Sequence, residues 1–344
     1  MKELSIIIPV YNVQNYLEDC LLSIYKQSLS LETFEVIAVN DGSTDKSIDI
    51  LRKYEEIYPN MIIISQKNSG QSVARNNGLT VASGKYVFFM DSDDYLCLDS
   101  LASLLSKATE HDLDVLRFDY KYVDEEGHEL DKKTNRDKRM QYSGRLVDGQ
   151  FLYEHLYQGE FFCLSLIKRS FLLKYSIQYK EGAFFEDVEY ALKIAYHANK
   201  VVYMDSCIYA YRQRGTSTIY TIDKKKVTDI IGASISVLQY IEDPSLGNGF
   251  KNVIKETVTS LMVFALLRIA ELKEREVQKS LCVLIHESGI SHLQPGKEVK
   301  EYIISCGFNV MGGWNVVRIL YPVVWLKKVK GIKKVFSMMQ FFYI

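Results

Sequence analysis

Short apolar runs alternate with longer amphipathic stretches through residues 1–122, and this alternation limits the folds open to the chain. The apolar runs, rich in Ile, Val and Phe, are Leu4–Val10, Phe34–Val39, Met61–Ser65 and Tyr86–Met90. Runs of this kind are typical of strands buried on both faces of a sheet. The stretches with helical spacing are Val13–Gln27, Thr44–Tyr58 and Gln71–Ala82, and a further helix is expected after Asp99. The alternation predicts an α/β fold, a mostly parallel sheet flanked by helices with right-handed crossovers.

The rest of the chain divides by composition. Ser43 and Asp99 are expected to cap helices, and a fifth strand is expected over Asp114–Tyr122. Residues 124–147 are charged and aperiodic, which is typical of a long loop. A helix over Glu186–Ala198 and a strand over Val201–Tyr211 follow. We therefore expect one domain over 1–215 with halves at 1–122 and 148–215, a helical region over 216–313, and an apolar basic tail over 314–344.

Charge and cysteine content exclude several classes of protein. The chain has 42 Lys and Arg against 43 Asp and Glu, so it has no overall field that would attract nucleic acid. Its six cysteines are widely spaced, which disfavours structural zinc and suits a reducing compartment. The longest uncharged stretch, 302–317, is shorter than the ~20 apolar residues that a membrane span needs. We expect a cytoplasmic protein without a transmembrane helix.

The tail is basic, because no acidic residue follows Glu301. Its basic residues are Arg318, Lys327, Lys328, Lys330, Lys333 and Lys334. Lysines interleaved with Trp and Phe suit the surface of an anionic membrane, which would place the protein peripherally on the inner face of the plasma membrane. The alternative is a final helix that packs on the catalytic domain and keeps a solvated basic face.

A polar cluster lies at the carboxyl end of each of the four expected strands, or shortly after it. The clusters are Pro9-Val10-Tyr11-Asn12, Asn40-Asp41-Gly42-Ser43-Thr44-Asp45, Asn68-Ser69-Gly70 and Asp91-Ser92-Asp93-Asp94. Ligands of open α/β sheets bind beyond the carboxyl ends of the strands. The four clusters together therefore predict a binding site at that edge.

The last cluster indicates a cation. Three carboxylates within four residues repel one another unless positive charge compensates them, and Mg²⁺ is commonly held by carboxylates together with substrate phosphates. The alternative is a capped turn, since Asp and Ser favour turns and helix starts.

The other clusters supply further candidate ligand contacts. Asp41 can accept a hydrogen bond from a base or sugar, and the alternative is that it is an ordinary turn residue after a strand. The amides of residues 68–70 are candidates to face a phosphate at a helix start. Arg75 lies about one turn further on.

Five segments give the chain a resemblance to the family-2 glycosyltransferases of the GT-A fold. They are SIIIPVYN, VNDGSTDKS, NSGQSVARNNGL, FMDSDD and FFEDVEYALKIA, in order over roughly residues 3–213. The resemblance implies an inverting transferase that uses a nucleotide-diphospho-sugar, UDP-linked by preference, with Mn²⁺ or Mg²⁺. It also implies a glycan or polyprenyl-diphosphate-linked acceptor, as in the synthesis of bacterial capsules and related polysaccharides.

The resemblance assigns roles to individual residues of this chain. Pro9, Val10 and Tyr11 would line the nucleoside pocket, Asp41 would bond the base, and Asn68, Gly70 and Arg75 would flank the nucleotide. Asp91, Ser92 and Asp93 match the DxD motif. Asp93 would ligate the metal, Asp91 would hold the ribose or a metal-bound water, and Asp94 is a third acid with no settled role.

The family's general base comes from a Glu-Asp pair at a helix start, which is Glu186-Asp187 here. We expect Asp187 to be the base and Glu186 to position the acceptor. Acids at a helix start also stabilise the helix dipole, which is the structural alternative. Arg212 and Arg214 are both candidates to touch the diphosphate.

Other functions fit the sequence less well. A nucleotidyltransferase would need a Gly-rich loop after the first strand, and a dehydrogenase would need GxGxxG there. A non-catalytic homologue that binds nucleotide-sugar or scaffolds a membrane synthesis complex is the remaining alternative, and the intact Asp93 and Asp187 count against it.

Overall fold

The computed structural model describes residues 2–97, 101–132, 134–157, 164–214 and 223–327. Within them the chain forms two compact units. The first contains Met1–Gly182 and Glu189–Ser217, and the second contains Ala183–Val188 and Thr218–Ile344. The expected cap Asp99 and the tail residues 328–344 lie outside the described residues.

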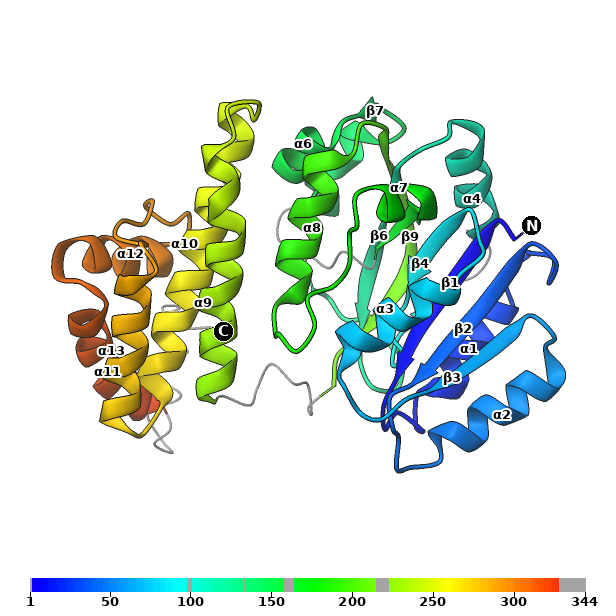
Figure 1. Cartoon of the computed structure of the whole chain (residues 1–344), viewed down its shortest axis with the longest axis horizontal. Helices are drawn as coiled ribbons and strands as arrows, with labels where there is room; N and C mark the ends of the chain where they lie inside the picture. The colour runs from blue at the N-terminus through cyan, green and yellow to red at the C-terminus, as the bar shows by residue number, and fades with distance from the viewer. Residues whose placement is uncertain (1, 98–100, 133, 158–163, 215–222, 328–344) are drawn as a thin grey trace. The chain divides into compact units, whose positions relative to one another are not determined.

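The first unit contains a sheet whose first four strands are parallel neighbours (Figure 1). These strands are β1 (Leu4–Val10), β2 (Phe34–Asn40), β3 (Met61–Ser65) and β4 (Tyr86–Phe89). The helices that follow them are α1 (Leu17–Tyr25), α2 (Ser47–Ile57), α3 (Gln71–Val81) and α4 (Leu101–Glu110). The predicted strand–helix alternation is confirmed, and every residue of β2 is buried.

Helices cover both faces of these strands. Leu17, Leu51 and Leu104, from α1, α2 and α4, share one core with Ile6 and Ile8 of β1. On the other face α3 packs against β1 and β2. Gly78 allows this close approach, because a Cβ there would lie 2.4 Å from Cγ2 of Ile7.

The remaining strands make the sheet mixed. They are β5 (Tyr95–Leu96), β6 (Val115–Val123), β7 (Leu146–Val147), β8 (Ser165–Lys168) and β9 (Val201–Arg212). The order is β3-β2-β1-β4-β8-β6-β9-β5, with β7 paired to β9. Strand β8 is antiparallel to both β4 and β6, whereas β6 and β9 are parallel. The expected fifth and later strands are thus present as β6 and β9.

Short helices and α8 complete this region. They are α5 (Arg136–Arg139), a 3-10 turn η1 (Met140–Tyr142), α6 (Gly149–Phe151), a π-helical turn η2 (Leu152–Tyr157), α7 (Arg169–Lys174) and α8 (Glu186–His197). The stretch expected as a loop therefore contains α5, η1 and β7. A buried ion pair joins it to the sheet.

That ion pair consists of Arg139 of α5 and Asp119 of β6, and both side chains are fully buried. The hydroxyl of Tyr203 on β9 donates a hydrogen bond to the same carboxylate. Next to them, Nε of Arg136 lies 2.5 Å from Oδ1 of Asp205. The charged composition of residues 124–147 is typical of a solvated loop. In the structure, some of these charged side chains form the contacts that hold the stretch on β6 and β9.

The second unit is helical. Its helices are α9 (Lys224–Leu238), a 3-10 turn η4 (Gln239–Glu242), α10 (Asn248–Glu271), α11 (Arg275–Glu287), α12 (Val299–Met311) and α13 (Gly313–Lys327). Val316, Val317 and Leu320 of α13 are buried, and α13 packs against α10, α11 and α12. The first part of the expected tail is therefore a packed helix. Among the described helices, none combines the length and apolar character needed to cross a membrane.

The expected cap at Ser43 is wrong. The residue that precedes α2 is Lys46, and its side chain makes no capping hydrogen bond. Ser43 Oγ instead accepts from the backbone N–H of Asn12 at 3.2 Å. This contact between Ser43 and Asn12 forms because β1 and β2 end side by side. The Ser43 hydroxyl therefore bonds to the loop after β1 and does not cap α2.

Replacing Arg139 by Met should destabilise the protein by about 3–5 kcal/mol, because Asp119 would remain buried without its cation. Urea unfolding would measure the loss. The matched control is Lys53→Met, which breaks the exposed ion pair between Lys53 and Glu18 and should cost about 1 kcal/mol or less. Equal losses in the two variants would contradict a structural role for the buried pair.

Candidate active site

The carboxyl ends of β1, β2 and β4 bring the predicted polar clusters to one edge of the sheet. Val10 pairs with Asn40 across β1 and β2, and the N–H of Asp41 donates to the carbonyl of Val10 at 2.9 Å. Pro9 and Val10 contribute backbone from inside the strand, whereas Tyr11 is 48% exposed. An aromatic ring therefore stands open to solvent at this edge.

Asp41 is buried and organises the turn that precedes α3. Its Oδ1 accepts from Nε2 of Gln66 and from the N–H of Ser69, each at 2.8 Å, and its Oδ2 accepts from the N–H of Gly70 at 2.9 Å. The sequence predicts that the amides of residues 68–70 face a phosphate. In the structure, the amides of Ser69 and Gly70 donate to Asp41. Asn68 and Gly70 lie exposed beside Asp41.

Gln66 and Asn77 extend this network, and sequence reasoning missed both. Nδ2 of Asn77 donates to Oε1 of Gln66 at 2.6 Å, which orients the Gln66 amide so that its nitrogen faces Asp41. A signal was available for Gln66, because it directly follows β3 and so stands at the same edge. Asn77 lies on α3, and its role depends on a contact that the sequence does not reveal.

Asp91 is held by Arg75. Nη2 of Arg75 lies 2.7 Å from Oδ1 of Asp91, and the Arg75 side chain is only 8% exposed. The guanidinium also lies 4.9 Å from the ring centroid of Tyr179, which stacks on Tyr190 at 3.9 Å. The arginine is therefore fixed from two sides and aims at the first acid of the DxD motif. Ser92, the middle residue, is buried.

Asp93 faces Arg214. Their Oδ2 and Nη2 atoms lie 2.5 Å apart, with side-chain exposures of 19% and 25%. Burial and the neighbouring charge of Asp91 raise the pKa of Asp93, although Arg214 acts in the opposite direction. An ionised Asp93 therefore needs a cation close by. Carboxylate oxygens on a loop with excess negative charge fit a hard divalent ion.

Asp94 faces residues of β9. Its Oδ2 accepts from the hydroxyl of Tyr209 at 2.6 Å, and its Oδ1 accepts from the N–H of Arg212 at 2.7 Å. Only 1% of the residue is exposed, and burial, followed by the charges of Asp93 and Asp91, raises its pKa well above the ordinary value. Asp94 thus ties the loop after β4 to β9.

Arg212 is engaged by protein groups. Its Nε donates to the carbonyl of Asp93 at 3.0 Å, its Nη2 lies 3.0 Å from Oδ2 of Asp19, and its Nη1 donates to the carbonyl of Glu125. The guanidinium also lies near the rings of Tyr16 and Tyr95. Of the two arginines that were candidates for the diphosphate, Arg214 is the one on an acid of the DxD motif.

Glu186 and Asp187 begin α8. They belong to the segment Ala183–Val188, which folds with the helical second unit, whereas Asp41, Asp91 and Asp93 belong to the first unit. The structure thus brings Asp41, Asp91 and Asp93, which are expected to face the sugar donor, together at one edge of the sheet. It places the expected catalytic pair at a helix start, as the sequence predicts.

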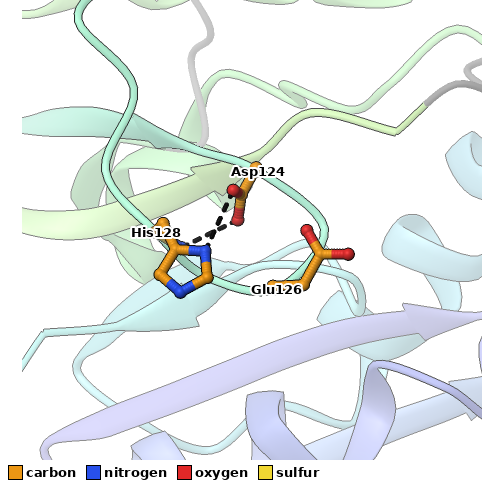
Figure 2. A group of neighbouring side chains, drawn as sticks. All are labelled: Asp124, Glu126 and His128. Atoms are coloured by element: carbon orange, nitrogen blue, oxygen red, sulfur yellow. Dashed lines mark hydrogen bonds and ion pairs between the residues drawn. The ribbon is translucent and has the colours of Figure 1, made fainter.

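A second group of possible metal ligands lies on the loop after β6. Oxygen or nitrogen atoms of Asp124, Glu126 and His128 lie within 4.8 Å of one another (Figure 2). Glu126 and His128 are exposed, and both oxygens of Asp124 already bond to His128, to its N–H at 2.8 Å and its Nδ1 at 3.1 Å. Both carboxylate oxygens of Asp124 are therefore engaged within this turn.

Comparison with known proteins agrees with this geometry. Residues 5–175 match the model of the family described as glycosyl transferase family 2. The chain carries a family-2 glycosyltransferase domain. The family resemblance is confirmed, and the matched residues include Asp41 and Asp93, whereas the fifth motif, at residues 184–195, lies beyond them.

Two relatives of this chain are bacterial glycosyltransferases. An uncharacterized glycosyltransferase, YibD of Escherichia coli, is 32% identical over 63% of this chain and 63% of its own length. The poly(ribitol-phosphate) beta-glucosyltransferase of Bacillus spizizenii is 33% identical over 49% of this chain and 26% of its own length. The chain thus spans less than two thirds of the length of these relatives.

A solved structure shows the same fold. The chain aligns with Staphylococcus aureus TarS residues 1–349, solved in complex with UDP-GlcNAc, with a TM-score of 0.69 over 95% of this chain and 93% of that one. The sequence identity is 19%, so the likeness bears on the fold alone. It confirms the predicted GT-A architecture with helices after the sheet.

Metal-dependent binding of a nucleotide should weaken on acidification at a higher pH than an ordinary aspartate would cause. Protons compete with the cation for Asp93, and its raised pKa makes that competition begin above the usual value of 3.8. Calorimetric titration of UDP with Mn²⁺, from neutral pH toward that value, would measure the effect. The control is the same titration without metal. An affinity that stays constant until the ordinary aspartate pKa would contradict this assignment.

Proposed function

We propose that this chain is an inverting glycosyltransferase that moves a sugar from a nucleotide-diphospho-sugar, UDP-linked by preference, to a glycan or lipid-linked oligosaccharide. The observation that carries the proposal is the convergence of Asp41, Asp91 and Asp93 at one sheet edge of a family-2 domain, with Arg75 and Arg214 on the two DxD acids. UDP is favoured because a structure of the same fold was solved with UDP-GlcNAc.

In this proposal the nucleoside lies against the ends of β1 and β2. Pro9, Val10 and Tyr11 line its pocket, and the exposed ring of Tyr11 offers a stacking surface. Asp41 accepts a hydrogen bond from the base, and its rigid support by Gln66 and the turn amides keeps the carboxylate oriented. Asn68, Gly70 and Arg75 flank the nucleotide.

The carboxylate oxygens of Asp91 and Asp93 are suitable ligands for the Mn²⁺ or Mg²⁺ that the family implies. Asp93 would hold the ion, with Asp91 contributing directly or through the ribose or a water. When bound, the cation supplies positive charge at the leaving diphosphate. Arg214, paired with Asp93 at 2.5 Å, provides a positive charge at the same carboxylate.

The transfer itself is one in-line displacement. The acceptor hydroxyl oxygen forms a bond to the anomeric carbon while the bond from that carbon to the diphosphate oxygen breaks, and the nucleoside diphosphate leaves with the bonding electrons. Asp187 takes the hydroxyl proton as general base, and Glu186 orients the acceptor. One displacement inverts the anomeric configuration.

Asp93→Asn and Asp187→Asn should each abolish transfer while the protein stays folded. Loss of the Asp93 charge should also weaken metal-dependent nucleotide binding, whereas Asp187→Asn should leave donor affinity nearly unchanged because the base acts on the acceptor. Sugar transfer and thermal unfolding of the purified variants would be measured side by side. The exposed Asp137→Asn is the matched control and should behave as wild type. Transfer at the wild-type rate by Asp187→Asn would show that the base assignment is wrong.

The nucleotide is identified first by a thermal-shift panel of UDP, GDP, CDP and dTDP, each with and without Mn²⁺. A ligand that binds only the folded state at 100 times its dissociation constant stabilises it by roughly 2.7 kcal/mol. A shift for one nucleotide that requires Mn²⁺ supports the proposal. Failure of all four to shift a folded sample favours the non-catalytic scaffold.

We also propose that the basic tail contacts an anionic membrane surface, where a polyprenyl-linked acceptor would reside. The described part of the tail expected at 314–344 belongs to α13, which packs in the helical unit. An exposed apolar stripe runs along α12 just before it: Val299, Ile303 and Val310 are 65%, 53% and 84% exposed. Exposed apolar groups on a helix, combined with basic residues elsewhere in the same region, suit a membrane interface.

Replacing Lys328, Lys330, Lys333 and Lys334 by Gln should reduce co-sedimentation with phosphatidylglycerol vesicles, since each basic residue contributes about 1 kcal/mol near an anionic surface. The substituted positions lie outside the described residues, whereas deletion of 314–344 would remove the buried residues Val316 and Val317 of α13. Phosphatidylcholine vesicles are the control and should bind wild type weakly. Unchanged sedimentation of the substituted protein would contradict membrane contact through the tail.

A further inference from the structure

Two phenylalanines lead directly into the Glu186-Asp187 pair, and both are held by helices of the second unit. Phe184 and Phe185 lie in the segment Ala183–Val188, which folds with α9 and α10. The two residues are in contact with different helices. Together the contacts fix the backbone at the point where α8 begins.

Phe184 is held by the first turns of α9. Its N–H donates to Oδ2 of Asp229 at 3.1 Å, and Nζ of Lys225 donates to the same oxygen at 2.6 Å. The ammonium groups of Lys225 and Lys226 lie 5.2 and 4.8 Å from the centroid of the Phe184 ring. Asp229 is 16% exposed, so its bonds form in a largely desolvated place. Backbone and ring of Phe184 are therefore both bound to one helix.

Phe185 has a left-handed backbone, with φ of 64°. Such a conformation in a bulky residue costs on the order of 1–3 kcal/mol and persists only where surrounding contacts impose it. Here the Phe185 ring packs on Phe264 of α10, with centroids 5.7 Å apart and planes at 66°. The guanidinium of Arg268 lies 4.6 Å from the Phe264 ring centroid. The bend at Phe185 immediately precedes Glu186, so it sets the direction in which α8 starts.

We propose that Asp229 and Phe264 are positioning residues for the general base. This inference rests on the proposed role of Asp187. We call two contacts the clamp: the hydrogen bond from the Phe184 N–H to Asp229 and the packing of Phe264 on the Phe185 ring. The clamp acts through Phe184 and Phe185, by fixing the bend that orients the first turn of α8 and so the Asp187 carboxylate. All donor-side residues belong to the first unit, so the clamp should influence the rate of transfer and not the binding of donor.

The test is Asp229→Ala, assayed by release of UDP from UDP-glucose and UDP-N-acetylglucosamine in the presence of acceptor extract. Misplacement of a reacting group by about 1 Å costs about a hundredfold in rate. We expect kcat to fall about tenfold to a hundredfold, with the KM for donor and the UDP thermal shift unchanged. Asp229→Asn keeps an oxygen that accepts from the Phe184 N–H and should retain most of the activity. The matched control, Glu276→Ala on the exposed start of α11, should retain all of it.

Phe264→Ala gives a second, independent variant, because it removes the ring that supports Phe185 without altering Asp229. It should lower kcat in the same way, and Phe264→Leu should restore part of the loss. A parallel fall of kcat, donor affinity and unfolding temperature in these variants would overturn the proposal, since it would indicate a general folding role.

Asp187→Asn separates failure of this inference from failure of the proposed function. If Asp187→Asn is inactive while Asp229→Ala and Phe264→Ala keep the wild-type kcat, the clamp is refuted and the base assignment stands. If Asp187→Asn is fully active, the base assignment fails, and the clamp proposal fails with it.

Discussion

Repulsion among three carboxylates within four residues is the constraint around which this edge of the sheet is built. Asp91, Asp93 and Asp94 follow a fully buried strand, so they cannot separate by moving apart along the chain. They separate by facing different partners. Asp91 faces Arg75 of α3, Asp93 faces Arg214, and Asp94 turns inward to Tyr209 and the Arg212 backbone. The loop thereby joins the parallel strands of the first half to β9.

The three acids of this loop therefore differ in what they contact. Asp94 is buried, accepts two hydrogen bonds and fixes the backbone of the loop. Its two neighbours face cationic side chains that are themselves supported, Arg75 by Tyr179 and Arg214 by the nearby ring of Tyr16. A carboxylate held in this way has a fixed orientation.

The first half of the fold could be predicted from sequence because its signals are local. β1 and β3 have the predicted bounds, since each apolar run ends abruptly at a polar cluster. Pairings that depend on residues far apart in the chain were beyond local patterns. The insertion of the short strand β8 between β4 and β6 is one case. The buried Arg139–Asp119 pair is another, because its charges lie in a stretch with the composition of a solvated loop.

The site shows the same limit at the level of single side chains. Residue types at a strand end predict that charge gathers there, but they do not say which partner each charge will find. Arg212 and Arg214 are two residues apart. Arg212 bonds to backbone carbonyls and Asp19, whereas Arg214 pairs with Asp93.

The bend before α8 shows a similar limit. In the sequence, Phe184 and Phe185 form only an apolar pair before an acidic helix start. Only the left-handed backbone at Phe185 reveals that the pair forms a bend, and a bend held from two helices has a fixed direction. A general base must be aimed as well as supplied, so in the proposed mechanism the residues that hold this bend would act in transfer together with Asp187.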